Sequence, residues 1–102
     1  MNILTVCQMG NVRSVGTKAR LIHRGHRDVI AIGATNTSPE TLDMLYDWAE
    51  VVLLAEPGLA EYLPDDTKVE KKFTIGPDTF RWYGNQQLKE IVDKQLKELD
   101  LG

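Results

Sequence analysis

A cysteine, an arginine and a serine lie within eight residues of one another in the stretch TVCQMGNVRSVG. Cys7 ends an apolar run, and the residues after Ser14 can form a helix. The loop between them would join a strand to a helix N-terminus, where successive backbone N–H groups can hold an anion. Gly10 permits the tight or left-handed turn that such a loop requires. We therefore predict a phosphate-binding loop made of Gln8, Met9, Gly10, Asn11, Val12, Arg13 and Ser14.

These residue types suit phosphoryl transfer through a cysteine. Loop N–H groups, the helix dipole and Arg13 would all favour the thiolate form of Cys7, which is the nucleophilic form. The planar guanidinium of Arg13 matches two oxygens of a phosphate. Ser14 can hydrogen-bond the sulfur and help it to leave in a second step. The predicted reaction is attack on a phosphate monoester, formation of a phosphocysteine and hydrolysis by water.

The elements around this loop alternate between strand and helix. Strands are expected at residues 3–6, 28–32 and 51–54, with a weaker edge strand at 69–75. Helices are expected after Ser14, from a Ser38-Pro39-Glu40 start, at 57–63, and over a C-terminal amphipathic stretch. In the first helix Val15, Ala19 and Ile22 are predicted to form the buried side. Its basic side, with charges at 20, 24 and 27, is interpreted as solvated.

Alternation of this kind favours an α/β fold in which helices cover both faces of a parallel sheet. We predict a single domain over residues 1–102, a flavodoxin-like three-layer sandwich with four strands in the order 2-1-3-4. Ligands of such sheets bind beyond the carboxyl ends of the strands, where the winding reverses. Cys7 would lie at that place.

The full set of features resembles the low-molecular-weight protein tyrosine phosphatase superfamily, whose signature is a Cys-x5-Arg-Ser loop with a Gly-Asn pair after the first strand. Similarity extends to the stretches IGATN, WAEVVL and IGPD, so that it covers nearly the whole chain. It is greatest to a short, compact branch of predicted phosphatases. The resemblance implies that Cys7 is the nucleophile, Arg13 the phosphate clamp, Ser14 the stabiliser of the sulfur and Asp78 the general acid, with Asn11 bracing the loop.

The chain departs from that family in three places. Gly10 and Asn11 are the third and fourth residues after the cysteine, whereas the family has this pair at the second and third positions. Proline precedes Asp78, whereas in the family it follows the acid. Many members have a second cysteine near the first, whereas Cys7 is the only cysteine of this chain. An oxidised Cys7 would therefore need an external thiol for rescue.

Composition narrows the classes of partner. The 102 residues carry a formal charge of −3, which argues against a general nucleic-acid binder. No stretch approaches membrane-spanning length, and no signal peptide is recognised. A single cysteine excludes an internal disulfide, which favours a reducing cytoplasmic location. We expect no metal and no cofactor, and a phosphorylated protein (phosphotyrosine) or a small phosphate ester as the substrate.

Three alternative functions stay open. A phosphotransferase-system B subunit carries phosphate on cysteine in a Cys-x-x-Gly-x-x-Thr/Ser-Ser loop, whose spacing Cys7, Gly10 and Ser14 fit well, although Arg13 argues against it. Thioredoxin-coupled arsenate reduction would need further cysteines. The third alternative is a weakly active or non-catalytic phosphate-binding protein.

Individual residues have simpler interpretations too. Asp78 is alternatively a plain loop carboxylate, and Asp65 and Asp66 are rival acids that a turn explains. The aromatic residues Phe80, Trp82 and Tyr83 either form a pocket wall or cover the C-terminal helix.

Overall fold

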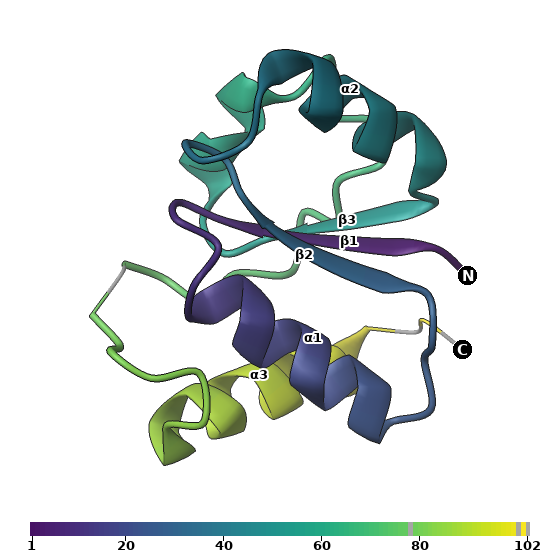
Figure 1. Ribbon diagram of the computed structural model, residues 1–102. Helices are drawn as coiled ribbons and strands as arrows, with labels where there is room; N and C mark the ends of the chain where they lie inside the picture. Colours follow the sequence, from purple (N-terminus) through teal and green to yellow (C-terminus); the bar gives the residue numbers. More distant parts are fainter. Residues whose placement is uncertain (78, 100, 102) are drawn as a thin grey trace.

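The computed structural model describes residues 1–77, 79–99 and 101 and has a parallel sheet at its centre (Figure 1). The strands are β1 (Ile3–Cys7), β2 (Val29–Gly33) and β3 (Val51–Leu54), in the order β2-β1-β3. In this register Cys7 lies opposite Gly33 of β2, and Val6 lies opposite Leu54 of β3. The three carboxyl ends therefore meet at one edge of the sheet.

Helices cover both faces of the sheet, as expected for a three-layer α/β fold. On one face lie α1 (Arg13–His23) and α3 (Gln86–Glu98), and on the other lie α2 (Pro39–Trp48) and the 3₁₀ helix η1 (Pro57–Tyr62) (Figure 1). Ser38 caps α2 by accepting a hydrogen bond from the N–H of Thr41, with Pro39 at the first helical position. No helix in the described parts of the chain is long and apolar enough to cross a membrane.

Successive residues of the strands supply two hydrophobic clusters. Leu4 and Val6 of β1 pack with Leu42 and Tyr46 of α2. Ile3 of the same strand belongs to the other cluster, with Leu21, Leu88 and other residues of α1 and α3. All five residues of β1 are buried, which is the pattern of a central strand covered on both faces. The sheet is thus shared by both halves of the core.

The expected fourth strand at residues 69–75 is absent, so the sheet has three strands. The segment makes one isolated parallel bridge, between Val52 and Val69, and contacts the residue after β3 where the N–H of Ile75 donates to the Ala55 carbonyl. Between these points the chain turns: the N–H of Phe73 donates to the Glu70 carbonyl, and the N–H of Lys72 donates to the Glu70 carboxylate. These local bonds use the backbone groups that a continuous ladder needs.

The buried side of α1 differs from the predicted one. Gly16, Thr17 and Leu21 are buried, whereas Ala19 is exposed and Ile22 is 49% exposed. A Cβ placed on Gly16 would lie 3.0 Å from the Leu88 side chain and 3.1 Å from the Tyr83 carbonyl. Because α3 packs so closely, small residues occupy this side of α1. The basic side is only partly solvated, since Arg20 contacts α3.

Candidate active site

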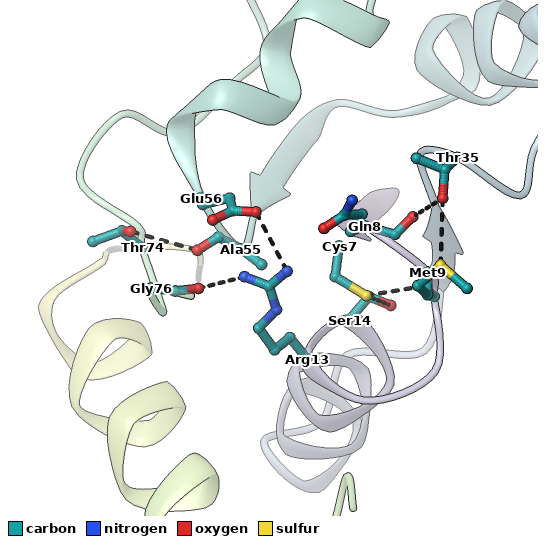
Figure 2. Close-up of polar contacts among 11 residues, drawn as sticks. Cys7, Gln8, Met9, Arg13, Ser14, Thr35, Ala55, Glu56, Thr74 and Gly76 are labelled. Carbon is teal, nitrogen blue, oxygen red and sulfur yellow. Dashed lines mark hydrogen bonds and ion pairs between the residues drawn. The ribbon is translucent and has the colours of Figure 1, made fainter. Parts of the chain in front are cut away.

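Cys7 ends β1 and is 3% exposed, with its sulfur directed at the first turn of α1 (Figure 2). Its Sγ lies 3.1 Å from the Oγ of Ser14 and accepts a hydrogen bond of 3.1 Å from the backbone N–H of Gly10. Ser14 is itself buried, and its carbonyl accepts a hydrogen bond from the Thr5 hydroxyl. The predicted contact between Ser14 and the sulfur is therefore present, and two polar groups surround the sulfur.

Two glycines let the loop lie directly on the end of β2. Gly10 has a φ of 77°, in the left-handed region that glycine adopts without strain. A Cβ on Gly10 would lie 2.6 Å from the backbone nitrogen of Gly33, and one on Gly33 would lie 2.3 Å from the carbonyl carbon of Met9. Side chains at either position would overlap backbone atoms, so both glycines are required for this approach.

The loop after β2 fixes the orientation of the peptide groups in the loop between Cys7 and Arg13. The carbonyl of Gln8 accepts hydrogen bonds from the N–H and the hydroxyl of Thr35, at 3.0 and 2.8 Å. The carbonyl of Met9 accepts a 2.7 Å bond from the Asn36 side chain. In a trans peptide the carbonyl and the following N–H point in opposite directions. The N–H groups of Met9 and Gly10 therefore point away from this loop, and that of Gly10 reaches the sulfur.

This arrangement corrects the role expected for Asn11. Its side chain is exposed and makes no hydrogen bond to the residues that the structure describes. Thr35 and Asn36 brace the loop instead. Their position just beyond the carboxyl end of β2 is the signal that could have identified them, because such residues face the ligand edge of a parallel sheet.

Arg13 begins α1, and its side chain is fully buried. Its guanidinium donates to the carbonyl of Gly76 and lies 3.5 Å from a carboxylate oxygen of Glu56 (Figure 2). Glu56 follows the carboxyl end of β3 and was not among the predicted site residues. All three strand ends thus contribute to one place: Cys7 from β1, Thr35 after β2 and Glu56 after β3.

The late segment reaches the same edge. Ile75 and Gly76 donate their N–H groups to the Ala55 carbonyl, and the Gly76 carbonyl accepts from Arg13. The predicted acid Asp78 lies outside the described residues. Phe80 packs against the core cluster on the α1–α3 face, whereas Trp82 and Tyr83 are 62% and 47% exposed. The aromatic side chains therefore divide between the core and the surface.

Asp65 and Asp66 have contacts that make them poor general acids. The hydrogen bond from the Tyr46 hydroxyl, assisted by Thr67, lowers the pKa of Asp65 below its usual value. The Lys71 ammonium lowers the pKa of Asp66 in the same way. A general acid must hold its proton near the working pH, and these contacts favour the ionised form.

Within the described ranges no group of three or more His, Cys, Asp or Glu side chains could hold a metal ion. Comparisons of the chain with models of known protein families, with curated proteins and with solved structures gave no match.

Proposed function

We propose that this protein is a phosphate-monoester hydrolase that works through a phosphocysteine on Cys7, in the manner of a protein tyrosine phosphatase. The observation that carries the proposal is the hydrogen bond from the Gly10 N–H to the Cys7 sulfur. The carbonyls of Gln8 and Met9 in the same loop accept hydrogen bonds from Thr35 and Asn36 and so do not face the sulfur. Amide groups turned this way stabilise negative charge on the sulfur and on an oxyanion beside it. The Cys-x5-Arg-Ser resemblance supports the same reaction.

In the first step the Cys7 sulfur forms a bond to phosphorus while the bond from phosphorus to the leaving alkoxide or phenoxide oxygen breaks. Asp78 is proposed to give its proton to that oxygen. In the second step water attacks phosphorus, Asp78 takes a proton from the water, and the sulfur–phosphorus bond breaks. Ser14 donates its hydroxyl hydrogen to the departing thiolate, from its position 3.1 Å away.

Arg13 is proposed to bind two oxygens of the phosphoryl group. Its guanidinium is dry, held at the N-terminus of α1 and oriented by the Glu56 carboxylate. A guanidinium in this setting stabilises the phosphoryl group most in the transition state, where the negative charge of that group is spread over its oxygens. The substrate would be a phosphorylated protein, with phosphotyrosine as the favoured residue, or a small phosphate ester. A single reduced cysteine suits the cytoplasm.

The second candidate is a phosphocysteine carrier. It is favoured by one observation: Glu56 offsets the charge of Arg13, and turnover of the phosphocysteine would be slower if the guanidinium stayed with that carboxylate. A carrier must keep its phosphoryl group for a partner, whereas a hydrolase releases it to water. The two functions therefore differ in the lifetime of the phosphorylated protein.

The deciding experiment measures hydrolysis of p-nitrophenyl phosphate together with the mass of the protein during turnover. We expect hydrolysis by the wild type, none above background by Cys7→Ser, and a loss of about 10²–10³-fold in kcat for Arg13→Lys, which loses the planar fork. Binding of inorganic phosphate by Cys7→Ser, measured by calorimetry, shows that the loop is intact. Hydrolysis that persists in Cys7→Ser contradicts the proposal. A stable phosphoprotein without release of phosphate favours the carrier, and phosphate binding without either favours a non-catalytic protein.

A further inference from the structure

A groove of about 500 Å³ runs between the C-terminal halves of α1 and α3, on the outer side of the layer that these helices form. Figure 1 shows the two helices packed on the same face of the sheet. The groove residues of α1 lie in its last turn and at its C-cap, at the other end of the helix from Arg13. Six of the described residues line it: Arg20 and His23 from α1, Arg24 at the C-cap of that helix, and Asp93, Lys94 and Lys97 from α3.

The groove concentrates positive charge on an acidic chain. Four fully charged cations and the Asp93 carboxylate give the lining a formal charge of +3, with His23 counted as neutral. The whole chain has a formal charge of −3, so the remaining residues carry −6. An anionic partner would therefore be attracted to this place more than to the rest of the molecule taken as a whole.

The only carboxylate of the lining is already engaged. Asp93 accepts a 2.8 Å bond from the Nε of Arg20, and its backbone carbonyl accepts from Arg24. Lys94 and Lys97 are exposed and make no ion pair with any residue that the structure describes. Like charges at a spacing of three on a helix repel each other. Both ammonium groups are therefore accessible to an external anion.

The lining favours an acidic polypeptide over nucleic acid. None of the six lining residues is aromatic, so unstacked bases would find no platform. A long polyanion would also have to cross the acidic remainder of the surface. A short segment with a few glutamates or aspartates matches the limited charge of the groove.

We propose that this groove docks an acidic segment of a phosphoprotein whose phosphorylated side chain is the substrate at Cys7. The inference rests on the proposed function and narrows its substrate to a protein. Arg20 and Arg24 follow Arg13 by seven and eleven residues, which is roughly 10–17 Å along the helix at 1.5 Å per residue. An extended peptide covers that distance with about three to five residues. The acidic residues of the partner therefore lie about three to five positions from the phosphorylated one.

The test compares two phosphotyrosine peptides that differ only at the third to fifth positions on each side, with glutamates in one and glutamines in the other. The groove variant is Lys94→Glu/Lys97→Glu. The control is Lys71→Glu/Lys72→Glu, which makes the same change of charge at two exposed lysines outside the groove. Because this control also breaks the ion pair of Lys71 with Asp66, circular dichroism checks that it is folded. For the wild type we expect a lower KM for the glutamate peptide, with equal kcat, and a smaller preference at high salt.

For the groove variant we expect the KM of the glutamate peptide to rise about tenfold, a size that follows from two partly exposed charge contacts. Its hydrolysis of the glutamine peptide and of p-nitrophenyl phosphate should stay unchanged, and the control variant should resemble the wild type. Equal KM values for the two peptides in the wild type, or equal effects of both variants, overturn the docking groove.

Direct binding separates this inference from the proposed function. Fluorescence anisotropy of a labelled, unphosphorylated glutamate peptide measures the groove without hydrolysis, and Cys7→Ser should bind it as the wild type does. Failure of the wild type to hydrolyse p-nitrophenyl phosphate contradicts the proposed function, whereas hydrolysis of p-nitrophenyl phosphate without this peptide binding contradicts the groove alone. Tighter binding of single-stranded RNA, or of vesicles of phosphatidylserine and phosphatidylcholine, at the same lysines would also overturn it.

Discussion

Gly33 shows how strongly a single residue can constrain the candidate active site. Its Cα faces the Met9–Gly10 peptide so closely that a methyl group would overlap the carbonyl carbon of Met9 at 2.3 Å. Atoms of the backbone cannot rotate away as a flexible side chain does, so the loop would have to move. The position of the Gly10 N–H on the sulfur thus depends on a residue of another strand.

We expect Gly33→Ala to lower the free energy of unfolding by about 1–3 kcal/mol, the usual cost of overpacking, and to weaken the binding of inorganic phosphate. Chemical denaturation and calorimetry measure the two effects. Gly58→Ala is the matched control, because a Cβ there meets nothing within 4 Å. A Gly33→Ala protein with wild-type stability and phosphate affinity would contradict the close contact.

At the scale of residues, sequence reasoning found the groups that are local to one loop. Cys7, Gly10 and Ser14 were predicted to lie together, and the structure places the Gly10 N–H and the Ser14 hydroxyl on the sulfur. Glu56 and the bracing pair Thr35 and Asn36 were missed as site residues. Their contribution depends on which loops meet in space, and only the strand order, not the spacing along the chain, decides that.

At the scale of elements, apolar runs predicted three strands and the helices between them, because burial on both faces demands such runs. The segment 69–75 has strand-forming residues as well, but its local turn bonds compete successfully with a ladder. The buried side of α1 also differs from the predicted one, and the reason is again a contact that the sequence pattern does not show. Apolar periodicity points to large residues, whereas close packing of α3 selects Gly16 and Thr17.

The connection between α2 and the segment after η1 provides a prediction about pH. Asp65 accepts hydrogen bonds from the buried Tyr46 hydroxyl at 2.5 Å and from the N–H of Thr67 at 3.0 Å. These bonds, with the Tyr46 bond the largest, lower the pKa of Asp65 below its ordinary value of 3.8. Their contribution to stability is therefore complete above pH 3.8 and is lost as the pH falls through the lower folded pKa.

We expect Asp65→Asn to be less stable than the wild type at pH 7, because a neutral amide accepts these hydrogen bonds more weakly. The difference in the free energy of unfolding should shrink as the pH falls from 3.8 through the lower folded pKa, because the Asp65 carboxyl group is then protonated and, like the amide, uncharged. Urea denaturation between pH 2.5 and 7 measures it. Asp43→Asn, at an exposed position of α2, should follow the wild type throughout. A difference that stays constant with pH would mean that the carboxylate charge has no part in the contact.

At the scale of the molecule, α1 connects the two places that the proposals concern. Its first residue, Arg13, belongs to the candidate active site, and its last turns, with Arg20 and Arg24, line the cationic groove. Close packing on α3 at Gly16 holds the helix between them. A substrate that contacted both ends would therefore meet a rigid spacing, which is why the proposed distance between the phosphorylated and acidic residues is narrow.

The whole fold depends on a sheet that two hydrophobic clusters share, and Leu88 tests that dependence. Its side chain is fully buried in the cluster of α1 and α3, so that Leu88→Ala should lower the free energy of unfolding by about 2–5 kcal/mol. Trp48 packs against the cluster on the opposite face. Because β1 supplies both clusters, we expect Trp48 fluorescence, read in a Trp82→Phe background, to lose its folded signal at the same lowered denaturant concentration as the far-ultraviolet circular dichroism.

The control is Ile22→Ala, at a half-exposed position of α1, which should lower the free energy of unfolding by less than about 1 kcal/mol. A Trp48 transition that kept its wild-type midpoint in Leu88→Ala would mean that the two faces unfold separately, and the sheet would then not transmit the loss of packing from one face to the other.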